Sequence, residues 1–340
     1  MSAPDARGEF GLIERIIHRL GDAAARDILV PPGDDAAAWR ARGAVTVATT
    51  DAMVEGVHWR ASDSPDGRAT MSWTDVGWRA IASNVSDIAA MGAVPDFALI
   101  SAILGPSLST GGALDCLVDG IAEACRAHEV RVAGGDLDRG AQSVVAVTLI
   151  GHLDGEAALR RDGARVGDVV AVSGHPGASA AGLALIEAGR DHEPAFGSLV
   201  QAHRRPRARV VLGHGALESG LLCAIDISDG VLQDLGHLAE RSGVGIEVEL
   251  NALPVASAAL AAFGRERALD LCLGGGEDFE LAFTGPAARI EGLSTSSLPV
   301  TVVGRVVEAH PGEAWALDER GERYVPPSIG WDHFRGVATS

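Results

Sequence analysis

The sequence predicts an α/β protein with mixed sheets, built from two domains. Strand-like and helix-like apolar patterns alternate along most of the chain, as they do in α/β folds. The chain has 340 residues, more than one domain usually holds. Its 47% hydrophobic and 22% charged residues are typical of a globular protein and exclude long disorder. We therefore expect an N-terminal domain over residues 1–152 and a C-terminal domain over residues 153–340.

In the first half, apolar residues recur at helical spacing early in the chain and then alternate over a short strand from Val45. Asn84 and Asp87 are three residues apart in a predicted helix, so they share one face. The expected elements are helices over residues 10–20, 73–91 and 114–128, a strand from residue 45 that ends at Thr49-Thr50-Asp51, and strands over residues 97–104 and 144–150.

The second half begins with a linker rich in Gly, Arg and Asp, over residues 152–168. Its Arg160, Arg161 and Arg165 are either exposed linker charge or contacts to a phosphate. Farther on, Ser228 or Asp229 is a plausible N-cap for the helix that follows. The expected elements are strands over residues 169–172, 224–228, 244–250 and 300–307 and helices over residues 179–188 and 230–241.

Acidic residues gather in short clusters, most of them beside glycine, where apolar strands run out. Glycine lets the backbone turn sharply and approach a ligand closely, and sets of oxygen ligands suit Mg²⁺ carrying a polyphosphate. The alternative is a solvated acidic face, but such a face scatters Asp and Glu along helices. The clusters are Gly33-Asp34-Asp35, Thr49-Thr50-Asp51, Asn84-Val85-Ser86-Asp87, Gly134-Gly135-Asp136, Asp226-Ile227-Ser228-Asp229-Gly230 and Gly274-Gly275-Gly276-Glu277-Asp278.

The chain contains no lysine, because all 28 Lys and Arg residues are arginine. This excludes a P-loop lysine, a kinase strand lysine and a Schiff-base lysine. Charge compensation for any phosphate must come from metal ions, arginine and backbone N–H groups.

Overall charge and cysteine content restrict the partners and the compartment. A net charge of −18 argues against nucleic acid or an anionic membrane as partner. The four cysteines show no C-x-x-C spacing and lie in apolar surroundings, which indicates reduced core residues. The start of the chain lacks the pattern of a signal peptide, and no stretch has the length of a membrane span. We expect a cytoplasmic protein.

Eight segments, taken together and in order, resemble the thiamine-monophosphate kinase family. Single motifs such as Gly-Gly-Asp are common, but the ordered set, which runs from residue 8 to residue 334, is specific. The segments are Gly8-Glu9-Phe10, Gly33-Asp34-Asp35, Thr49-Thr50-Asp51, residues 84–93, Gly134-Gly135-Asp136, residues 225–230, residues 275–281 and Gly330-Trp331-Asp332-His333-Phe334.

The resemblance implies the fold of aminoimidazole-ribonucleotide synthetase, with an N-terminal domain that pairs with its twin in a homodimer and a C-terminal domain that completes an active site between the two. It also implies that ATP phosphorylates thiamine monophosphate, without a covalent nucleophile on the protein. The implied magnesium ligands are Asp35, Thr49, Thr50, Asp51, Asp87, Asp136, Asp226 and Asp229. The implied nucleotide contacts are Gly135, Asp136, Arg161 and Ser228, and the implied contacts to thiamine monophosphate are His58, Glu277 and Trp331.

One departure concerns adenine. Some members of the family have a tyrosine near the base, whereas this chain offers Leu114, Leu117 and Val118, which puts stacking at that point in question.

Two other classes of function compete with this interpretation. Selenophosphate synthetase and a hydrogenase-maturation protein are similar in fold and in ATP chemistry, but both use a cysteine or selenocysteine near one end of the chain. Here no cysteine precedes Cys116 or follows Cys272. The second competing class is a non-catalytic nucleotide or metal sensor, which could retain every residue that binds metal or nucleotide.

Overall fold

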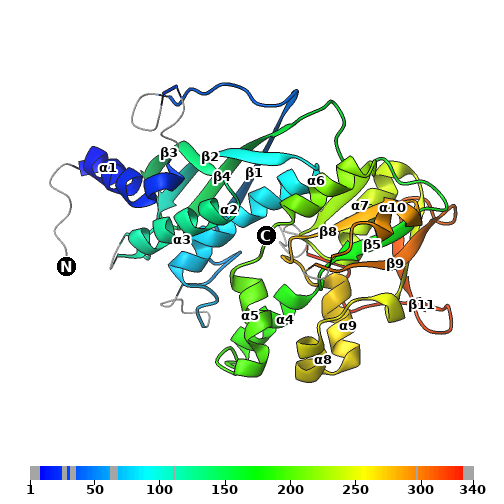
Figure 1. The fold of residues 1–340 in the computed structure, drawn as a ribbon. Helices are drawn as coiled ribbons and strands as arrows, with labels where there is room; N and C mark the ends of the chain where they lie inside the picture. Colours follow the sequence, from blue (N-terminus) through cyan, green and yellow to red (C-terminus); the bar gives the residue numbers. More distant parts are fainter. Residues whose placement is uncertain are drawn as a thin grey trace, which may run out of the picture. The chain divides into compact units, whose positions relative to one another are not determined.

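The computed structural model describes residues 8–24, 29–30, 36–61, 68–109, 112–295 and 298–331. The chain divides into two compact units, the first with residues 1–89 and 93–156 and the second with residues 90–92 and 157–340. Each unit contains one mixed sheet and several helices (Figure 1). The predicted α/β class is therefore confirmed.

The first unit is built around a four-stranded sheet in the order β1-β4-β2-β3. Strands β2 and β3 are parallel and the other pairs are antiparallel. Helix α3 connects β2 to β3, since parallel neighbours need a crossover. The elements are α1 (Gly8–Leu20), η1 (Gly21–Ala23), β1 (Val45–Val54), α2 (Trp73–Ala90), β2 (Val94–Leu104), α3 (Ala113–Ala127), β3 (Arg131–Arg139) and β4 (Val144–Leu153).

Helices α2 and α3 lie against the same face of this sheet (Figure 1). Along β4, Val145, Val147 and Leu149 are fully buried on that face, and the alternate residues are only half-buried. The two helices pack at a pair of glycines. A Cβ atom on Gly77 would overlap the carbonyl oxygen of Leu117, and one on Gly120 would overlap that of Thr74.

The second unit is built around a seven-stranded sheet in the order β11-β10-β7-β9-β5-β8-β6. Its strands are β5 (Val169–Ser173), β6 (Cys223–Ile227), β7 (Gly245–Glu249), β8 (Glu280–Gly285), β9 (Val300–Val307), β10 (Ala314–Leu317) and β11 (Arg323–Tyr324). Its helices are α4 (Ala178–Glu187), η2 (Pro194–Phe196), α5 (Gly197–Arg204), α6 (Val210–Glu218), α7 (Val231–Ser242), η3 (Leu250–Ala252), α8 (Ser257–Phe263), α9 (Arg265–Gly274) and α10 (Ala287–Glu291).

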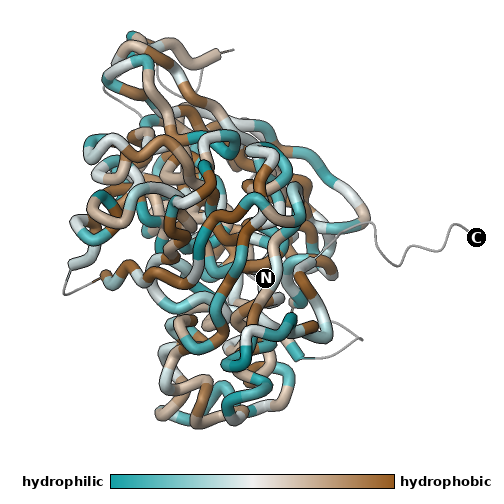
Figure 2. The backbone as a smooth tube through the Cα atoms, turned by 90° about the vertical axis from the view of Figure 1, so that its right-hand side faces the viewer, coloured by the Kyte–Doolittle hydropathy of each residue, from teal (hydrophilic) through white to brown (hydrophobic). Residues whose placement is uncertain are grey.

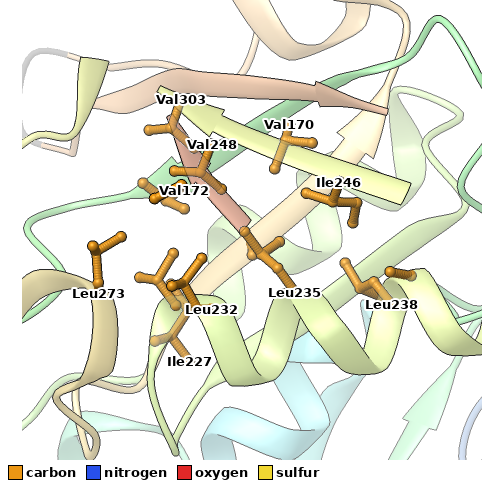
Figure 3. Packing of buried hydrophobic residues seen from close by; sticks show 14 of the residues in the cluster. Val170, Val172, Ile227, Leu232, Leu235, Leu238, Ile246, Val248, Leu273 and Val303 are labelled. Carbon is orange, nitrogen blue, oxygen red and sulfur yellow. The ribbon is translucent and has the colours of Figure 1, made fainter. Parts of the chain in front are cut away.

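Helix α7 carries the apolar stripe that anchors it to this sheet. Leu232, Leu235 and Leu238 recur three residues apart and point toward strand residues such as Val172 and Ile246 (Figure 3). All five are at most 4% exposed. This packing fixes the N-terminal end of α7, and with it the acidic loop that precedes the helix.

Two acidic clusters lie inside strands, which differs from the expectation that they follow strand ends. Strand β1 continues to Val54, so Thr49-Thr50-Asp51 lies at its middle. Gly134-Gly135-Asp136 belongs to β3, which pairs with β2 over eight residues on each strand. Strand β3 carries few apolar residues after Ala133, and Figure 2 shows such polar stretches alternating with apolar ones along the chain. The apolar alternation that predicts a strand is therefore weak there.

The cysteines agree with prediction at three of four positions. Cys125, Cys223 and Cys272 are buried free thiols, whereas Cys116 is exposed on α3, so its assignment to the core was wrong. Within the described residues, none of the helices combines the length and the apolar character needed to cross a membrane.

Candidate active site

In the first unit, Thr49 on β1 meets Asp87 on α2. The Thr49 hydroxyl donates a hydrogen bond of 2.6 Å to Asp87 Oδ2. Asp51 is two residues along β1 from Thr49, so its side chain leaves the strand on the same face, and it is exposed. The structure thus gathers two carboxylates and a hydroxyl at one place on the sheet.

Thr50 points to the opposite face of β1. Its hydroxyl donates to the carbonyl oxygen of Val147 at 3.1 Å and accepts a bond from the Thr148 hydroxyl at 3.2 Å. Thr50 therefore offers its side chain to the sheet face that α2 and α3 leave uncovered.

Within the first unit, Asp136 does not join the Thr49 and Asp87 group. Asp51 pairs with Val147 on β4, Val147 with Ile100 on β2, and Ile100 with Gly135 on β3. Asp51 and Gly135 thus lie at opposite edges of the sheet, three strand spacings or about 14 Å apart along it. Asp136 is the next residue after Gly135, so alternation turns its side chain to the uncovered face.

His58 lies in the turn that follows β1. Its Nδ1 accepts a hydrogen bond of 2.9 Å from the backbone N–H of Val54, which assigns the ring proton of a neutral imidazole to Nε2. Asp35, the remaining predicted ligand of this half, lies outside the described residues.

In the second unit, β6 leads directly into the acidic loop before α7. Asp226 is 3% exposed and lies on β6, and Ser228 and Asp229 follow where the strand ends. Neither of these two caps α7, so the predicted N-cap was wrong. Instead Asp234, on the first turn of α7, accepts three backbone N–H bonds of 3.0 Å with one oxygen, from Ser228, Asp229 and Gly230.

Asp234 is 2% exposed, and burial raises the pKa of its carboxyl group to about 7. Ligand atoms of Asp229, Asp234 and His237 lie within 4.8 Å of one another, which is close enough for a shared cation. One oxygen of Asp234 already accepts three N–H bonds, so its first task is to shape the loop. The spacing of Gly230 and Asp234 in the sequence indicates this role, because an aspartate side chain can accept a hydrogen bond from the backbone N–H four residues earlier.

A second acidic loop, residues 275–279, packs on the first. The N–H of Glu277 donates to the Ser228 carbonyl oxygen at 2.6 Å, and that of Phe279 to the Ile227 carbonyl oxygen at 2.9 Å. Glu277 and Phe279 both have positive φ, at 68° and 53°. Such backbone is strained for residues other than glycine and persists only where the surroundings fix it.

Two carboxylates next to Glu277 hold the fold together, and sequence reasoning did not separate them from ligands. Asp278 accepts the N–H groups of Gly177 and Ser179 at the start of α4, at 2.6 and 2.9 Å. Glu280 is buried and pairs with Arg209, whose Nε lies 2.8 Å from it. Asp278 and Glu280 therefore stabilise the fold, and Glu277 lies at the strained turn.

Trp331 ends the described chain and is 56% exposed. Its backbone N–H donates a hydrogen bond of 3.0 Å to the carbonyl oxygen of Asp229. Gln233 on α7 donates from Nε2 to Asp229 Oδ2 at 3.1 Å and to the Trp331 carbonyl oxygen at 2.6 Å. In the second unit, Ser228, Asp229, Glu277 and Trp331 are thus linked by hydrogen bonds.

Other expected contacts are more isolated. Arg161 is exposed, and its carbonyl oxygen accepts the Ser242 hydroxyl. Arg160 forms a two-point pair with Asp162, at 2.8 and 2.6 Å, which lowers the pKa of that carboxyl. On α3, Leu117 and Val118 are buried in the core, so neither offers a surface for adenine.

A cavity of about 330 Å³ in the first unit lies apart from these residues. Asp96 on its wall pairs with Arg42 at 3.2 Å and with His152 at 2.7 Å. None of the predicted site residues is among those that line it. We therefore do not assign the predicted chemistry to this cavity.

The fold and the acidic loops place the chain in a known class. Residues 33–153 match the N-terminal domain of AIR synthase related proteins, and residues 165–315 match the C-terminal domain of the same class. Within that class, the chain belongs to the thiamine-monophosphate kinase family. It is 36% identical over 332 residues to the thiamine-monophosphate kinase of Aquifex aeolicus, covering 96% of this chain and 98% of the relative.

Solved structures agree with this assignment. A crystal structure of thiamine-monophosphate kinase from Stenotrophomonas maltophilia has 34% identity and a TM-score of 0.79, covering 93% of this chain and 98% of that one. AaThiL complexed with AMPPCP and TMP has 34% identity and a TM-score of 0.74, covering 98% and 99%. A hydrogenase maturation protein, at 21% identity and a TM-score of 0.70 over 87% and 92% of the two chains, shares the fold.

Proposed function

We propose that this protein transfers the γ-phosphoryl group of ATP to thiamine monophosphate, giving ADP and thiamine diphosphate. The observation that carries the proposal is similarity to thiamine-monophosphate kinases along almost the whole chain. The acceptor is itself a phosphate anion, so the reaction needs alignment and charge neutralisation more than a strong base.

Magnesium suits the oxygen donors of the site. The Thr49 hydroxyl and the Asp87 carboxylate lie 2.6 Å apart, close to exposed Asp51. Hard cations such as Mg²⁺ take ligands of this kind and, when bound, neutralise phosphate oxygens. We propose Asp35, Thr49, Thr50, Asp51, Asp87, Asp136, Asp226 and Asp229 as the metal positions.

The remaining residues would bind and orient the two substrates. Gly135, Asp136, Arg161 and Ser228 are the proposed nucleotide contacts, and Arg161 can grip a phosphate with its fork of N–H groups. His58, Glu277 and Trp331 are the proposed contacts to thiamine monophosphate, where the exposed Trp331 indole offers a face for a flat cationic ring. None of these groups is proposed as a covalent nucleophile.

We further propose that the protein works as a homodimer formed through its N-terminal domain, residues 1–152, with residues 153–340 completing the active site. The exposed part of the sheet face that α2 and α3 leave uncovered supports this, because it carries small or apolar residues such as Ala48, Ala146 and Ile103. So does the separation of Asp51 from Asp136. If both serve the same metal ions, a second copy of the chain supplies one of them.

A cytoplasmic location is also part of the proposal. All four cysteines are free, and burial raises the pKa of the Cys125 thiol to about 12. Free thiols are typical of a reducing compartment.

A coupled ADP-release assay tests the function. ADP should appear with thiamine monophosphate, and only at a background rate with thiamine or with no acceptor. Equal ADP release without acceptor would indicate an ATPase. Binding of ATP without any turnover would favour the sensor.

A further inference from the structure

We propose that Gln233 is a positioning residue that couples the metal position Asp229 to the acceptor contact Trp331. This inference rests on the proposed kinase function and adds a residue to it. If Asp229 and Trp331 act as proposed, the hydrogen bonds of Gln233 make their positions depend on each other.

The contacts form a closed ring. Gln233 Nε2 donates to Asp229 Oδ2 at 3.1 Å and to the carbonyl oxygen of Trp331 at 2.6 Å. The backbone N–H of Trp331 donates to the backbone carbonyl oxygen of Asp229 at 3.0 Å, which closes the ring. A Cβ atom on Gly330 would overlap the Gln233 side chain, so the two segments are in close contact here.

The chemistry of the ring suits glutamine. A side-chain amide has two N–H hydrogens on one nitrogen, so it can donate to two acceptors at once. It is also neutral, so it does not cancel the negative charge of Asp229, which stays available to a cation. An arginine at this position would neutralise the charge of Asp229. A glutamate could not donate to the Asp229 carboxylate or to the Trp331 carbonyl oxygen, and its negative charge would repel both.

The neighbouring residue holds the same loop from its other side. Asp234 accepts the N–H groups of Ser228, Asp229 and Gly230, each at 3.0 Å. The backbone of Asp229 is therefore fixed by Asp234, and its carboxylate is oriented by Gln233. Through the second bond of Gln233, this orientation also depends on the segment that carries Trp331.

A coupling of this kind is reciprocal. If metal at Asp229 stabilises the ring, it strengthens binding of thiamine monophosphate, and the acceptor strengthens metal binding by the same factor. Gln233→Met keeps the length of the side chain and removes both hydrogen bonds. It should weaken this coupling without removing any ligand.

The test is steady-state kinetics on wild type and Gln233→Met, with Gln201→Met as control on the exposed face of α5. We expect Gln233→Met to raise both the KM for thiamine monophosphate and the Mg²⁺ concentration for half-maximal rate by about tenfold, as for a lost hydrogen bond to a charged group. The KM for ATP and the thermal midpoint should stay close to wild type, and the control should be unchanged.

A double-mutant cycle separates coupling from general damage. In a Trp331→Ala background, Gln233→Met should have little further effect on the KM for thiamine monophosphate, yet should still raise the Mg²⁺ requirement. Additive effects on that KM, or normal Mg²⁺ and acceptor dependence in Gln233→Met, would overturn the inference. If Gln233→Met does not fold, Gln233→Leu serves in its place, because it is also neutral and lacks both hydrogen bonds, with the same expected direction and the same outcomes against it.

The proposed function fails separately, and takes the inference with it, if wild type does not phosphorylate thiamine monophosphate. If wild type is active and Gln233→Met has the same Mg²⁺ requirement and the same KM for thiamine monophosphate, only the proposed coupling is contradicted.

Discussion

Carboxylates that look alike in the sequence differ in their partners. Asp234, Asp278 and Glu280 are buried and accept N–H or guanidinium bonds. Asp51 and Asp136 are exposed on strands. Buried carboxylates with several donors shape loops, and exposed ones remain available to a cation.

Removal of charge at a proposed metal position should harm catalysis more than folding. We expect Asp51→Asn or Asp87→Asn to lower kcat by a factor on the order of 10² or more, as when a charge clamp on the transition state is lost. The thermal midpoint without Mg²⁺ should stay the same or rise, because nearby like charges repel. Stopped assays and thermal melts measure both quantities. Near-normal turnover of both variants at saturating Mg²⁺ would show that the assignment is wrong.

Asp234 should give the protein a pH-dependent stability. Burial raises its pKa from 3.8 to about 7, so the folded state holds the proton more tightly than the unfolded state. Its contribution to the free energy of unfolding is full below pH 4 and is lost as the pH rises to about 7, with a slope of at most about 1.4 kcal/mol per pH unit. Asp234→Asn should lack this component. Urea unfolding at pH 5 and pH 7 measures it, and an identical pH slope in the two proteins would contradict the assignment.

At the scale of single residues, the sequence predicts where the acidic loops lie, but not which carboxylates stabilise a loop and which are available to a ligand. A cluster such as Gly-Gly-Glu-Asp-Phe-Glu shows that acids gather, yet the donors that satisfy Asp278 come from Gly177 and Ser179, about 100 residues earlier. Local spacing does not reveal partners at that distance.

At the scale of elements, the crossing of α2 and α3 depends on two glycines that leave no room for a side chain. This crossing positions α2, which carries Asp87, against the sheet.

We expect Gly120→Ala to lower the free energy of unfolding by about 1–3 kcal/mol, because overpacking outweighs the better helix propensity of alanine. The matched control is Gly236→Ala on α7, where an added Cβ meets nothing within 4 Å. The control should gain up to about 1 kcal/mol. Denaturant unfolding checks both, and a stability gain in Gly120→Ala would refute this view of the crossing.

Apolar periodicity predicted the longer helices and most strands of the two sheets, whereas strands β3, β8, β10 and β11 and helices α8, α9 and α10 were not expected. The stripe of Leu232, Leu235 and Leu238 predicts α7 because one helical face is buried. Strand β3 was missed because its later part is polar and largely exposed, so its pairing with β2 decides its structure. The extension of β1 past Asp51 likewise depends on β4.

At the scale of the whole molecule, the sheet register bears on assembly. Asp51 and Asp136 lie at opposite edges of one sheet, so the proposed metal positions need a second copy of the chain if they act together.

A subunit-mixing experiment tests this. Asp51→Asn and Asp136→Asn should each be inactive alone. After dissociation and reassociation of an equal mixture, about half of the dimers are mixed and one of their two sites is intact, so about a quarter of wild-type activity should return. Failure to regain activity in mixed dimers detected by mass would exclude a shared site, and a monomeric active protein would exclude the dimer.

Direct phosphoryl transfer to thiamine monophosphate is tested by following the γ-phosphoryl group itself. The enzyme, ATP labelled at the γ-phosphate, Mg²⁺ and thiamine monophosphate are incubated together, and the products are separated after a denaturing quench. We expect label in the terminal phosphate of thiamine diphosphate, in a one-to-one ratio with ADP, and none on the protein after incubation with ATP alone. Label recovered mainly as inorganic phosphate, or held on an aspartate of the protein, would contradict direct transfer to thiamine monophosphate.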